Sequence, residues 1–329
     1  MITYTISKNS INGHCFPTIT DALRALPKTL EPAVLQIQPG TYHEKITIDR
    51  PYVTLLGTNP ETTIISYDDY AYAQMEDGTK RGTFRSYTLF LDSHHITLEG
   101  ITIQNSASPR SKVGQCIALY ADGDVITVKN CRLISYQDTL FVGPLPPYPL
   151  SPGGFTGPKE FAKRLNGRQL YENCYICGDI DFIFGSGTAY FNHCEIASVY
   201  SEELLPTEPN KPPTYGYITA ASTPLGQDFG FIFYDCNFTS TCPKHSVYLG
   251  RPWRNHAKTV FLYCTFGEHI HPAGFHDWGK KEAHHTLFYA EYHCKGPGAV
   301  RSSRASFCQV LTDEASKFYS QSNVLGDFN

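Results

Sequence analysis

Methionine and tryptophan are scarce in this sequence, with two residues of each among 329, and long apolar runs and blocks of like charge are missing. A helix that crosses a bilayer needs about 20 consecutive apolar residues, which excludes a membrane partner. The 27 basic residues are balanced by 31 acidic ones, for a net charge of -4. No run of basic residues could form a phosphate-binding stripe, so we do not expect nucleic acid as a partner. The chain opens at Met1 directly into a strand-like pattern, without a basic or long apolar leader. We therefore expect a soluble protein.

Eleven cysteines are present, an odd number that cannot pair completely. Their density is below that of small disulfide scaffolds, so reduced thiols are the expected state. Tyrosine (22), phenylalanine (20), glycine (26) and proline (22) are abundant. This composition favours many short strands and turns over long helices and indicates an all-β protein.

One short pattern returns along the chain: apolar, any, apolar, polar, polar or glycine, small, polar, apolar. Alternating apolar residues and the lack of a helical period between copies predict a parallel β-helix. Its coils, of about 20 to 30 residues, would stack about 4.8 Å apart. The small position should form a column inside the helix, and it holds Ile101, Cys131, Cys174, Cys194, Cys236, Cys264 and Ala290.

We expect one domain over residues 1–329, with two loops inserted between coils. The stretches 144–158 and 201–214 are rich in proline or glycine and cannot hold central strands. The open ends of a β-helix need covers. A helix at about residues 16–27 should supply the first, with Ile19, Ala22, Leu23 and Leu26 on one face. A weaker pattern at Ala315, Phe318 and Tyr319 predicts a C-terminal helical segment.

Two groups of residues could be read as metal or redox sites, but an ordinary structural role explains each of them better. Cys174 and Cys177 lie three residues apart on one strand and should face opposite sides. The loop with His269, His271, His276 and Asp277 also contains proline and glycine, and ordinary surface polarity accounts for it. We therefore expect neither a metal nor another cofactor.

The candidate catalytic residues fall into register with the cysteine column. Asp138 and Asp181 each lie seven residues after a column cysteine, Cys131 and Cys174. Carboxylates on adjacent coils would stand about 5 to 8 Å apart. Because two negative charges at this distance repel, one carboxyl should keep its proton while the other is ionised. Arg251 precedes the column by the same 13 residues as Asp181. Its guanidinium should reach back and hold that carboxylate ionised.

Two amides and one aromatic residue complete the predicted site. Gln115 lies one coil before Asp138, and Gln137 is its neighbour, so their amides could stabilise an oxyanion. Spacing alone leaves open a solvated ladder of polar side chains with no catalytic role. Trp253, two residues after Arg251, favours catalysis on a carbohydrate because such aromatics often stack on sugars.

Five segments together resemble the pectin methylesterases, in the order found in that family. They are Gly40-Thr-Tyr-His-Glu44, Gly114-Gln-Cys-Ile-Ala-Leu119, Tyr136-Gln-Asp-Thr-Leu140, Gly178-Asp-Ile-Asp-Phe-Ile-Phe-Gly185 and Leu249-Gly-Arg-Pro-Trp253. The resemblance covers about Tyr4 to at least Phe266. It implies a right-handed parallel β-helix that hydrolyses galacturonate methyl esters without a cofactor.

The resemblance also implies a role for each matching residue. Asp181 is similar to the nucleophile, Asp138 to the general acid and base, Gln115 and Gln137 to the oxyanion donors, and Arg251 to the nucleophile's partner; Trp253, Phe184 and Phe141 match substrate-binding positions. Phe141 stands where tyrosine is common, and Asp179 stands where plant members usually have threonine and looks more like bacterial members. The 144–158 insertion should build one wall of the cleft.

The implied partner is methyl-esterified polygalacturonate or an oligogalacturonide, bound by a monomer. Alternatives are another pectin-active β-helix enzyme, a polygalacturonase or a pectate lyase, and a carbohydrate-binding β-helix without activity. A glycosidase needs two or three acids around the bond, and a lyase needs a calcium-binding carboxylate cluster. Because no leader is visible and the cysteine count is odd, we expect a cytoplasmic enzyme rather than a processed secreted form.

Overall fold

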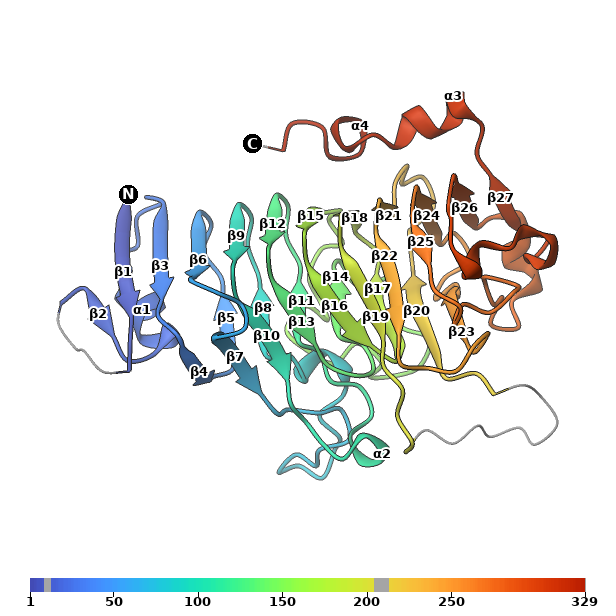
Figure 1. The fold of residues 1–329 in the computed structure, drawn as a ribbon. Helices are drawn as coiled ribbons and strands as arrows, with labels where there is room; N and C mark the ends of the chain where they lie inside the picture. The colour runs from blue at the N-terminus through green and yellow to red at the C-terminus, as the bar shows by residue number, and fades with distance from the viewer. Residues whose placement is uncertain (9–12, 204–212, 329) are drawn as a thin grey trace.

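The computed structural model describes residues 1–8, 13–203 and 213–328. Figure 1 shows the chain winding from the blue N-terminus to the red C-terminus as a right-handed parallel β-helix, as predicted. Three parallel sheets form its walls, and each strand inside a sheet pairs with strands of the neighbouring coils on both sides. No helix in this part of the chain is long and apolar enough to cross a membrane.

The walls are named sheets A, B and C here. Sheet A has 12 strands in the order β2 (Cys15–Phe16), β1 (Ile2–Ile6), β3 (Ala33–Ile37), β6 (Val53–Gly57), β9 (Ile96–Glu99), β12 (Ile126–Lys129), β15 (Arg168–Glu172), β18 (Thr188–Asn192), β21 (Phe231–Tyr234), β24 (Lys258–Leu262), β26 (Phe288–Tyr292) and β27 (Cys308–Val310). Sheet B has eight, namely β25 (Thr265–Phe266), β22 (Asn237–Ser240), β19 (Glu195–Ser198), β16 (Tyr175–Gly178), β13 (Arg132–Ile134), β10 (Thr102–Asn105), β7 (Thr63–Tyr67) and β4 (Gly40–His43). Sheet C has seven, namely β23 (Val247–Gly250), β20 (Gly216–Ala221), β17 (Ile180–Gly185), β14 (Leu140–Val142), β11 (Leu119–Ala121), β8 (Leu89–Leu91) and β5 (Ile46–Ile48).

Short helices lie between and beyond the coils. The α-helices are α1 (Ile19–Ala25), α2 (Arg110–Val113), α3 (Asp313–Ser316) and α4 (Gln321–Leu325). Short 3-10 helices are η1 (Thr83–Arg85), η2 (Lys281–His285), η3 (Pro297–Ala299), η4 (Arg301–Ser303) and η5 (Lys317–Tyr319).

The corner between sheets A and B explains the sequence repeat. One residue in the left-handed region turns the chain there in successive coils, with φ between 48° and 66°: Gly100, Asn130, Asn173, His193, Asp235, Tyr263 and His293. Glycine and asparagine tolerate this conformation best, which accounts for the polar or glycine position of the repeat. The next residue points inward, and the cysteines of the column are nearly fully buried.

The last member of the column was predicted wrongly. Strand β24 pairs with β26 so that Val260 faces Ala290 and Leu262 faces Tyr292, and this register brings Cys264 opposite Cys294. Ala290 instead packs in a cluster beneath the C-terminal segment. The error arose because the alternating apolar stretch around Ala290, four residues before Cys294, has the same pattern as the repeat. The true corner is His293-Cys294, which matches His193-Cys194.

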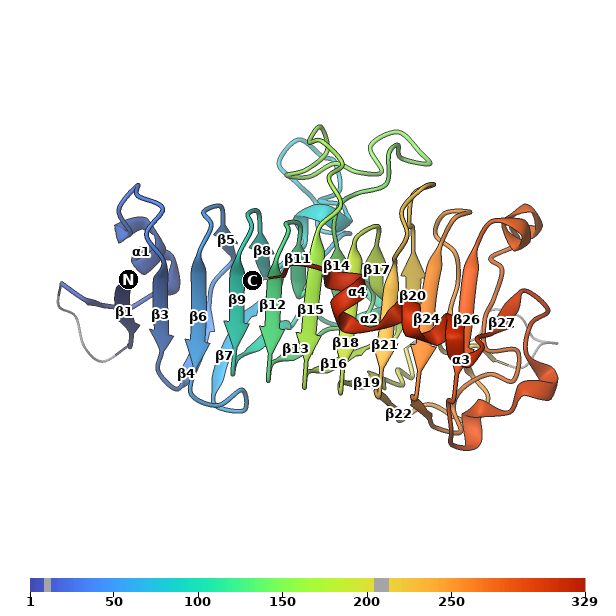
Figure 2. The same ribbon diagram turned by 90° about the horizontal axis from the view of Figure 1, so that it is seen from above.

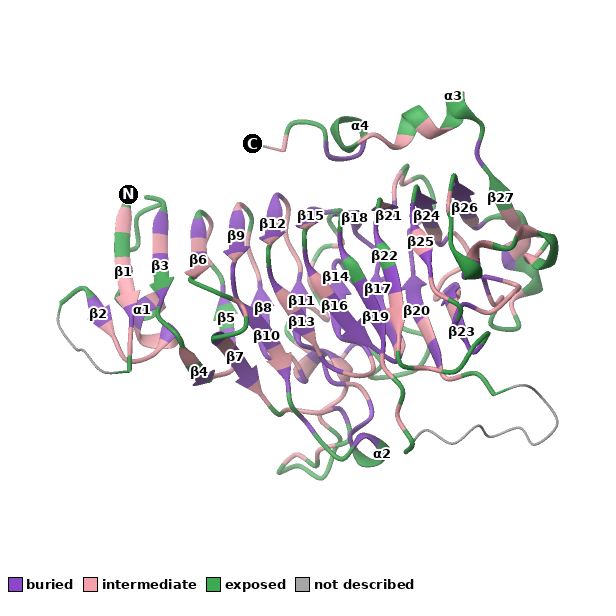
Figure 3. Ribbon diagram, viewed as in Figure 1, coloured by how far each residue is buried: buried purple, intermediate pink, exposed green. Residues whose placement is uncertain are grey.

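The interior is packed by residues that stack on their own kind. Each column thiol from Cys174 to Cys294 donates to a backbone oxygen one coil earlier, over 3.3 to 3.5 Å between sulfur and oxygen. Four aromatic rings on successive coils lie face to face, with centroids 4.4 to 4.9 Å apart: Tyr171, Phe191, Phe233 and Phe261. Figure 3 shows these strands as buried along the body of the helix.

Helix α1 covers the N-terminal end, as predicted. Thr18 caps it by accepting a hydrogen bond from the Asp21 amide. The Glu44 carboxylate accepts two more, from the amides of Ile19 and Thr20, each over 2.9 Å. Ile19 is fully buried, so the helix shields the open end of the first coils.

The predicted C-terminal helical segment is present, but it does not cap the other end of the β-helix as expected. Figures 1 and 2 show α3, η5 and α4 running back along the outer face of sheet A. Val324 and Leu325 pack there on outward apolar residues such as Tyr190 and Ile232. The outward side of these strands is apolar. Covering it buries more apolar surface, and so stabilises the fold more, than covering the small end of the β-helix would.

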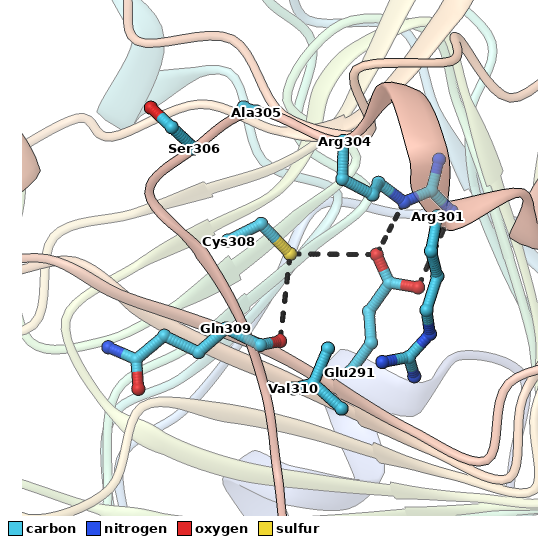
Figure 4. Close-up of a pocket in the computed structure, with 8 residues that line it drawn as sticks. All are labelled: Glu291, Arg301, Arg304, Ala305, Ser306, Cys308, Gln309 and Val310. Atoms are coloured by element: carbon cyan, nitrogen blue, oxygen red, sulfur yellow. Dashed lines mark hydrogen bonds and ion pairs between the residues drawn. The ribbon is translucent and has the colours of Figure 1, made fainter.

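A short loop region with a buried ion pair closes the C-terminal end. The Glu291 carboxylate accepts a hydrogen bond from Arg304 Nε over 2.7 Å, and the Cys308 thiol donates to the same carboxylate over 3.6 Å. Figure 4 shows these residues around a small cavity. Burial beside Glu291 raises the pKa of Cys308 well above its ordinary value, so this thiol stays protonated.

Candidate active site

Asp138 and Asp181 occupy matching positions on neighbouring coils of sheet C. Strand β14 pairs with β17 so that Leu140 faces Ile183, which places the two carboxylates one rung apart. The Asp138 amide donates to the carbonyl of Ile180 over 3.1 Å. Both residues adopt left-handed backbone conformations, with φ of 65° and 51°, and both are more than nine-tenths buried. The predicted pair is therefore brought together.

Arg251, which follows β23, reaches back two coils to Asp181. Its Nε donates to Oδ1 over 2.8 Å and its Nη2 to Oδ2 over 2.6 Å. The guanidinium carbon lies 3.8 Å from the ring centroid of Tyr217 and 3.7 Å from that of Trp278. This two-point contact between aromatic rings fixes the orientation of the carboxylate.

The surroundings separate the proton affinities of the two carboxyls. Burial raises the pKa of Asp138 well above its ordinary range, and the nearby charge of Asp181 raises it further. Burial also raises the pKa of Asp181, but the charge and hydrogen bonds of Arg251 oppose that effect. Asp138 is thus suited to donate a proton, and Asp181 is suited to act as the anion.

The two predicted amides border this pair from the preceding segments. Gln115 lies between α2 and β11, and Gln137 directly precedes Asp138. The Gln137 Oε1 accepts a hydrogen bond from Arg110 Nη2 over 3.2 Å. Arg110 in turn pairs with Asp179, between β16 and β17.

Trp253 is half-buried at the rim, where its ring lies 5.8 Å from that of Phe184 and 6.2 Å from that of Phe155. Phe141, predicted to bind substrate, is fully buried, and Phe184 is 4% exposed. Their rings pack into an aromatic cluster on the outer face of sheet C. Phe141 therefore packs beneath the surface of the site, and Phe184 exposes only a small part of its ring; their contact with a substrate stays a prediction.

The 144–158 insertion covers this cluster. Phe155 packs against Phe84, with ring centroids 5.8 Å apart, and Arg254 donates to the carbonyl of Tyr148 over 2.8 Å. Figure 2 shows the insertion standing above the sheet with the loop before η1. The insertion thus lies beside Trp253, and its role as a wall of the cleft stays a prediction. The other predicted loop, 201–214, falls largely on residues 204–212, which lie outside the described residues.

The histidine-rich loop serves the architecture around Arg251. His271 stacks on Tyr248 with centroids 4.2 Å apart, and His276 Nδ1 accepts from the Trp278 amide over 2.9 Å. Asp277 contacts His284 over 3.1 Å. Within residues 1–8, 13–203 and 213–328, no group of three or more His, Cys, Asp or Glu side chains is arranged to hold a metal ion.

Sequence reasoning missed several residues that hold the site. Tyr217 and Trp278 stack on Arg251, and Lys280 donates to the backbone oxygens of Pro252 and Trp253 over 2.6 and 3.1 Å. Burial, with the charges of Arg254 and Arg251, lowers the pKa of Lys280 to about 8. Arg110 was also missed. The sequence held one signal for Arg110. Asp179 lies in an apolar stretch, and a buried carboxylate requires a cation as partner, but the sequence did not show which cation it is.

A parallel β-helix that carries two carboxyls of unequal proton affinity, with an arginine on one of them, is an arrangement suited to catalysis by a carboxylate. The pectinesterase family model matches residues 6–145 and 162–327. The chain belongs to the pectinesterase family. Residues 146–161, within and just beyond the insertion, lie outside the matched stretches.

Relatives and solved structures agree with this assignment. Probable pectinesterase/pectinesterase inhibitor 23 of Arabidopsis thaliana is 30% identical over 322 residues, covering 94% of this chain and 50% of that protein. Pectinesterase 31 of the same plant is 28% identical, covering 97% and 91%. The chain thus spans half the length of the first relative and most of the second.

Among solved structures, pectin methylesterase PemA from Erwinia chrysanthemi superposes with a TM-score of 0.81 at 29% identity, covering 100% of this chain and 98% of that one. A mutant pectin methylesterase in complex with hexasaccharide IV gives 0.82 at the same identity and coverage.

Proposed function

We propose that this chain hydrolyses the C6 methyl esters of galacturonate residues in pectin or its oligomers, releasing methanol. The observation that carries the proposal is the buried Asp181 carboxylate, bound at two points by Arg251, with Asp138 one rung away. Arg251 leaves the carboxylate its nucleophilic lone pairs while opposing its protonation.

The proposed reaction has two steps. Asp181 attacks the ester carbonyl carbon, and the negative charge that develops on the carbonyl oxygen is stabilised by the amides of Gln115 and Gln137. The bond to the methoxy oxygen breaks as Asp138 donates its proton, so methanol leaves and an anhydride with Asp181 remains. Water then attacks the substrate carbonyl carbon of the anhydride, gives its proton to Asp138 and restores the Asp181 carboxylate.

The raised pKa of Asp138 suits the first step, because the group must hold its proton until the methoxy oxygen needs it. Trp253 is the proposed platform for a sugar ring, since it is half-buried two residues after Arg251 and its ring offers a polarisable face.

The test is methanol release from methylated pectin by the wild type and by Asp181→Asn. The amide keeps the shape of the side chain but is a very poor nucleophile, so kcat should fall at least about 1,000-fold with KM and Tm little changed. A variant that retains a tenth of the wild-type rate would refute the assignment. Reducing sugars or unsaturated products without methanol would instead support a glycosidase or a lyase.

The form of the substrate, the assembly and the location are further parts of the proposal. Methyl-esterified polymer or oligogalacturonide is the proposed partner, and we propose that the chain acts as a monomer. All eleven cysteines are unbridged, and eight of them are buried. This supports our proposal that the enzyme works in a reducing compartment on oligomers. A comparison of methanol release from short methylated oligomers and from long pectin tests that preference.

A further inference from the structure

A buried ion pair lies directly behind the proposed oxyanion amides. Arg110 Nε donates to Asp179 Oδ2 over 2.5 Å, and Arg110 Nη2 donates to Asp179 Oδ1 over 3.1 Å. The two side chains are 5% and 0% exposed. Replacing such pairs with apolar residues is often neutral or stabilising, so stability alone does not explain why one is placed here.

Arg110 also makes a third contact, which sets the orientation of an amide. Its Nη2 donates to Gln137 Oε1 over 3.2 Å. A guanidinium has five N–H donors and no acceptor, so only the oxygen of the carboxamide can face it. The Gln137 NH2 group must then point away from Arg110. An amide that flipped would set its own donors against the cation and present an oxygen to the developing oxyanion.

The same network ties together the segments that carry the other groups. Arg110 Nη1 donates to the carbonyl of Gly114, the residue before Gln115, over 3.4 Å. Asp179 Oδ1 accepts from the Ile180 amide over 2.6 Å, one residue before Asp181. Helix α2, the Gln137 side chain and the start of β17 are therefore held by one pair of charges.

We propose that Arg110, fixed by Asp179, is a positioning residue that holds the Gln137 amide with its NH2 group toward the oxyanion. The inference rests on the proposed function, because it assigns a task to the amide in ester hydrolysis. Asp179 keeps the guanidinium oriented so that one of its edges binds the carboxylate while an Nη2 proton remains for Gln137.

The test removes both charges at once, so that no unpaired charge is left buried. The double variant Arg110→Met/Asp179→Asn should keep a Tm near that of the wild type. In the methanol-release assay its kcat should fall about 10- to 100-fold with KM within about twofold, as expected for an interaction made only in the transition state. An unchanged kcat would overturn the proposal.

A mutant cycle separates positioning from general disturbance. In the wild type, Gln137→Ala should lower kcat about 100-fold or more, the cost of one oxyanion donor. In the double variant the same change should cost only a few-fold, because the amide there is no longer oriented. Gln115→Ala is the matched control and should keep most of its penalty in both backgrounds, because Arg110 contacts that segment at the Gly114 carbonyl, whereas it contacts the Gln137 side chain directly. A full penalty for Gln137→Ala in the double variant would refute the inference.

The single variant Arg110→Lys answers the question if the double variant does not fold. An ammonium keeps the charge opposite Asp179 but cannot bind both Asp179 and Gln137 in the planar geometry of arginine, so kcat should fall with KM retained. A wild-type kcat for this variant would contradict the proposal. If the wild type itself releases no methanol, the proposed function fails; if it does and these variants match it, only the role of Arg110 fails.

Discussion

Replacing Cys194 by alanine tests the packing of the column that defines this fold. Cys194 is 1% exposed, and its thiol donates to the carbonyls of Tyr171 and Asn192 over 3.4 and 3.5 Å. Neighbouring column members are Cys174 on the coil before and Cys236 on the coil after. The substitution removes one sulfur atom and leaves the backbone corner as it is.

The expected loss follows from burial and from the void. A group about the size of a methylene contributes about 0.8 kcal/mol when buried. A void on the order of 25 Å³ at about 24 cal/mol per Å³ adds about 0.6 kcal/mol. The weak thiol hydrogen bonds add little, so the free energy of unfolding should fall by about 1.5 kcal/mol.

Urea denaturation followed by circular dichroism measures this change, with Cys242→Ala as the matched control. Cys242 is only partly buried, and its sulfur lies 3.9 Å from the carbonyl oxygen of Ser198. The control should lose less than about 0.5 kcal/mol. Equal losses for both variants, or none for Cys194→Ala, would refute the packing argument. Titration of the protein unfolded without reductant should find all eleven thiols, and ten in disulfides would contradict the reduced state.

Four further predictions concern substrate binding and catalysis. Trp253→Ala should weaken binding of the galacturonate chain by about 1 to 3 kcal/mol, seen as a higher KM; unchanged kinetics would make this residue structural. EDTA should leave methanol release unchanged, whereas a loss restored by calcium would favour a lyase. With increasing pH, kcat/KM should rise as Asp181 loses its proton and then fall as Asp138 loses its own. Burial and the charge of Asp181 raise the pKa of Asp138, which places the fall at higher pH. Arg251→Met withdraws the cation that lowers the pKa of Asp181, so the acid limb should move to higher pH, and an unmoved limb would contradict this role.

The repeat made the fold predictable because its period and its small residues are local properties of the chain. The Asp138 and Asp181 pairing was predictable for the same reason, since both coils place the same number of residues between the corner and sheet C. Arg251 and Asp181 each precede a column cysteine by 13 residues, but this equal spacing does not place them in the same row of sheet C. Extending the pairing of Thr219 with Gly250 places Arg251 in the row of Phe184, not of Asp181. The contact exists because the arginine side chain is long.

Contacts between loops were beyond the reach of the sequence. Neither Trp278 on Arg251 nor Arg110 on Asp179 has a fixed spacing from the column, because insertions between coils vary in length. The burial of Phe141 had the same cause. Its alternating position on β14 is correct for an outward residue, but only the structure shows Phe84 and Phe155 lying over that face.

The backbone at the two aspartates explains how a flat sheet presents a reactive pair. The register between β17 and β20 shifts between Ile180 and Ile183, so β17 carries one extra residue at Asp181. Such bulges often re-aim a side chain beside an active site. Phe182 is fully buried in the core, and Asp181 turns to the outer side in a left-handed conformation with φ of 51°. Residues in such conformations cost on the order of 1 kcal/mol and persist where surrounding contacts hold them. Here two hydrogen bonds from Arg251 hold the Asp181 carboxylate, and a hydrogen bond from the Asp138 amide to the Ile180 carbonyl holds the Asp138 backbone. Both groups proposed to react therefore keep the left-handed conformation that the chain also uses at the corner between sheets A and B.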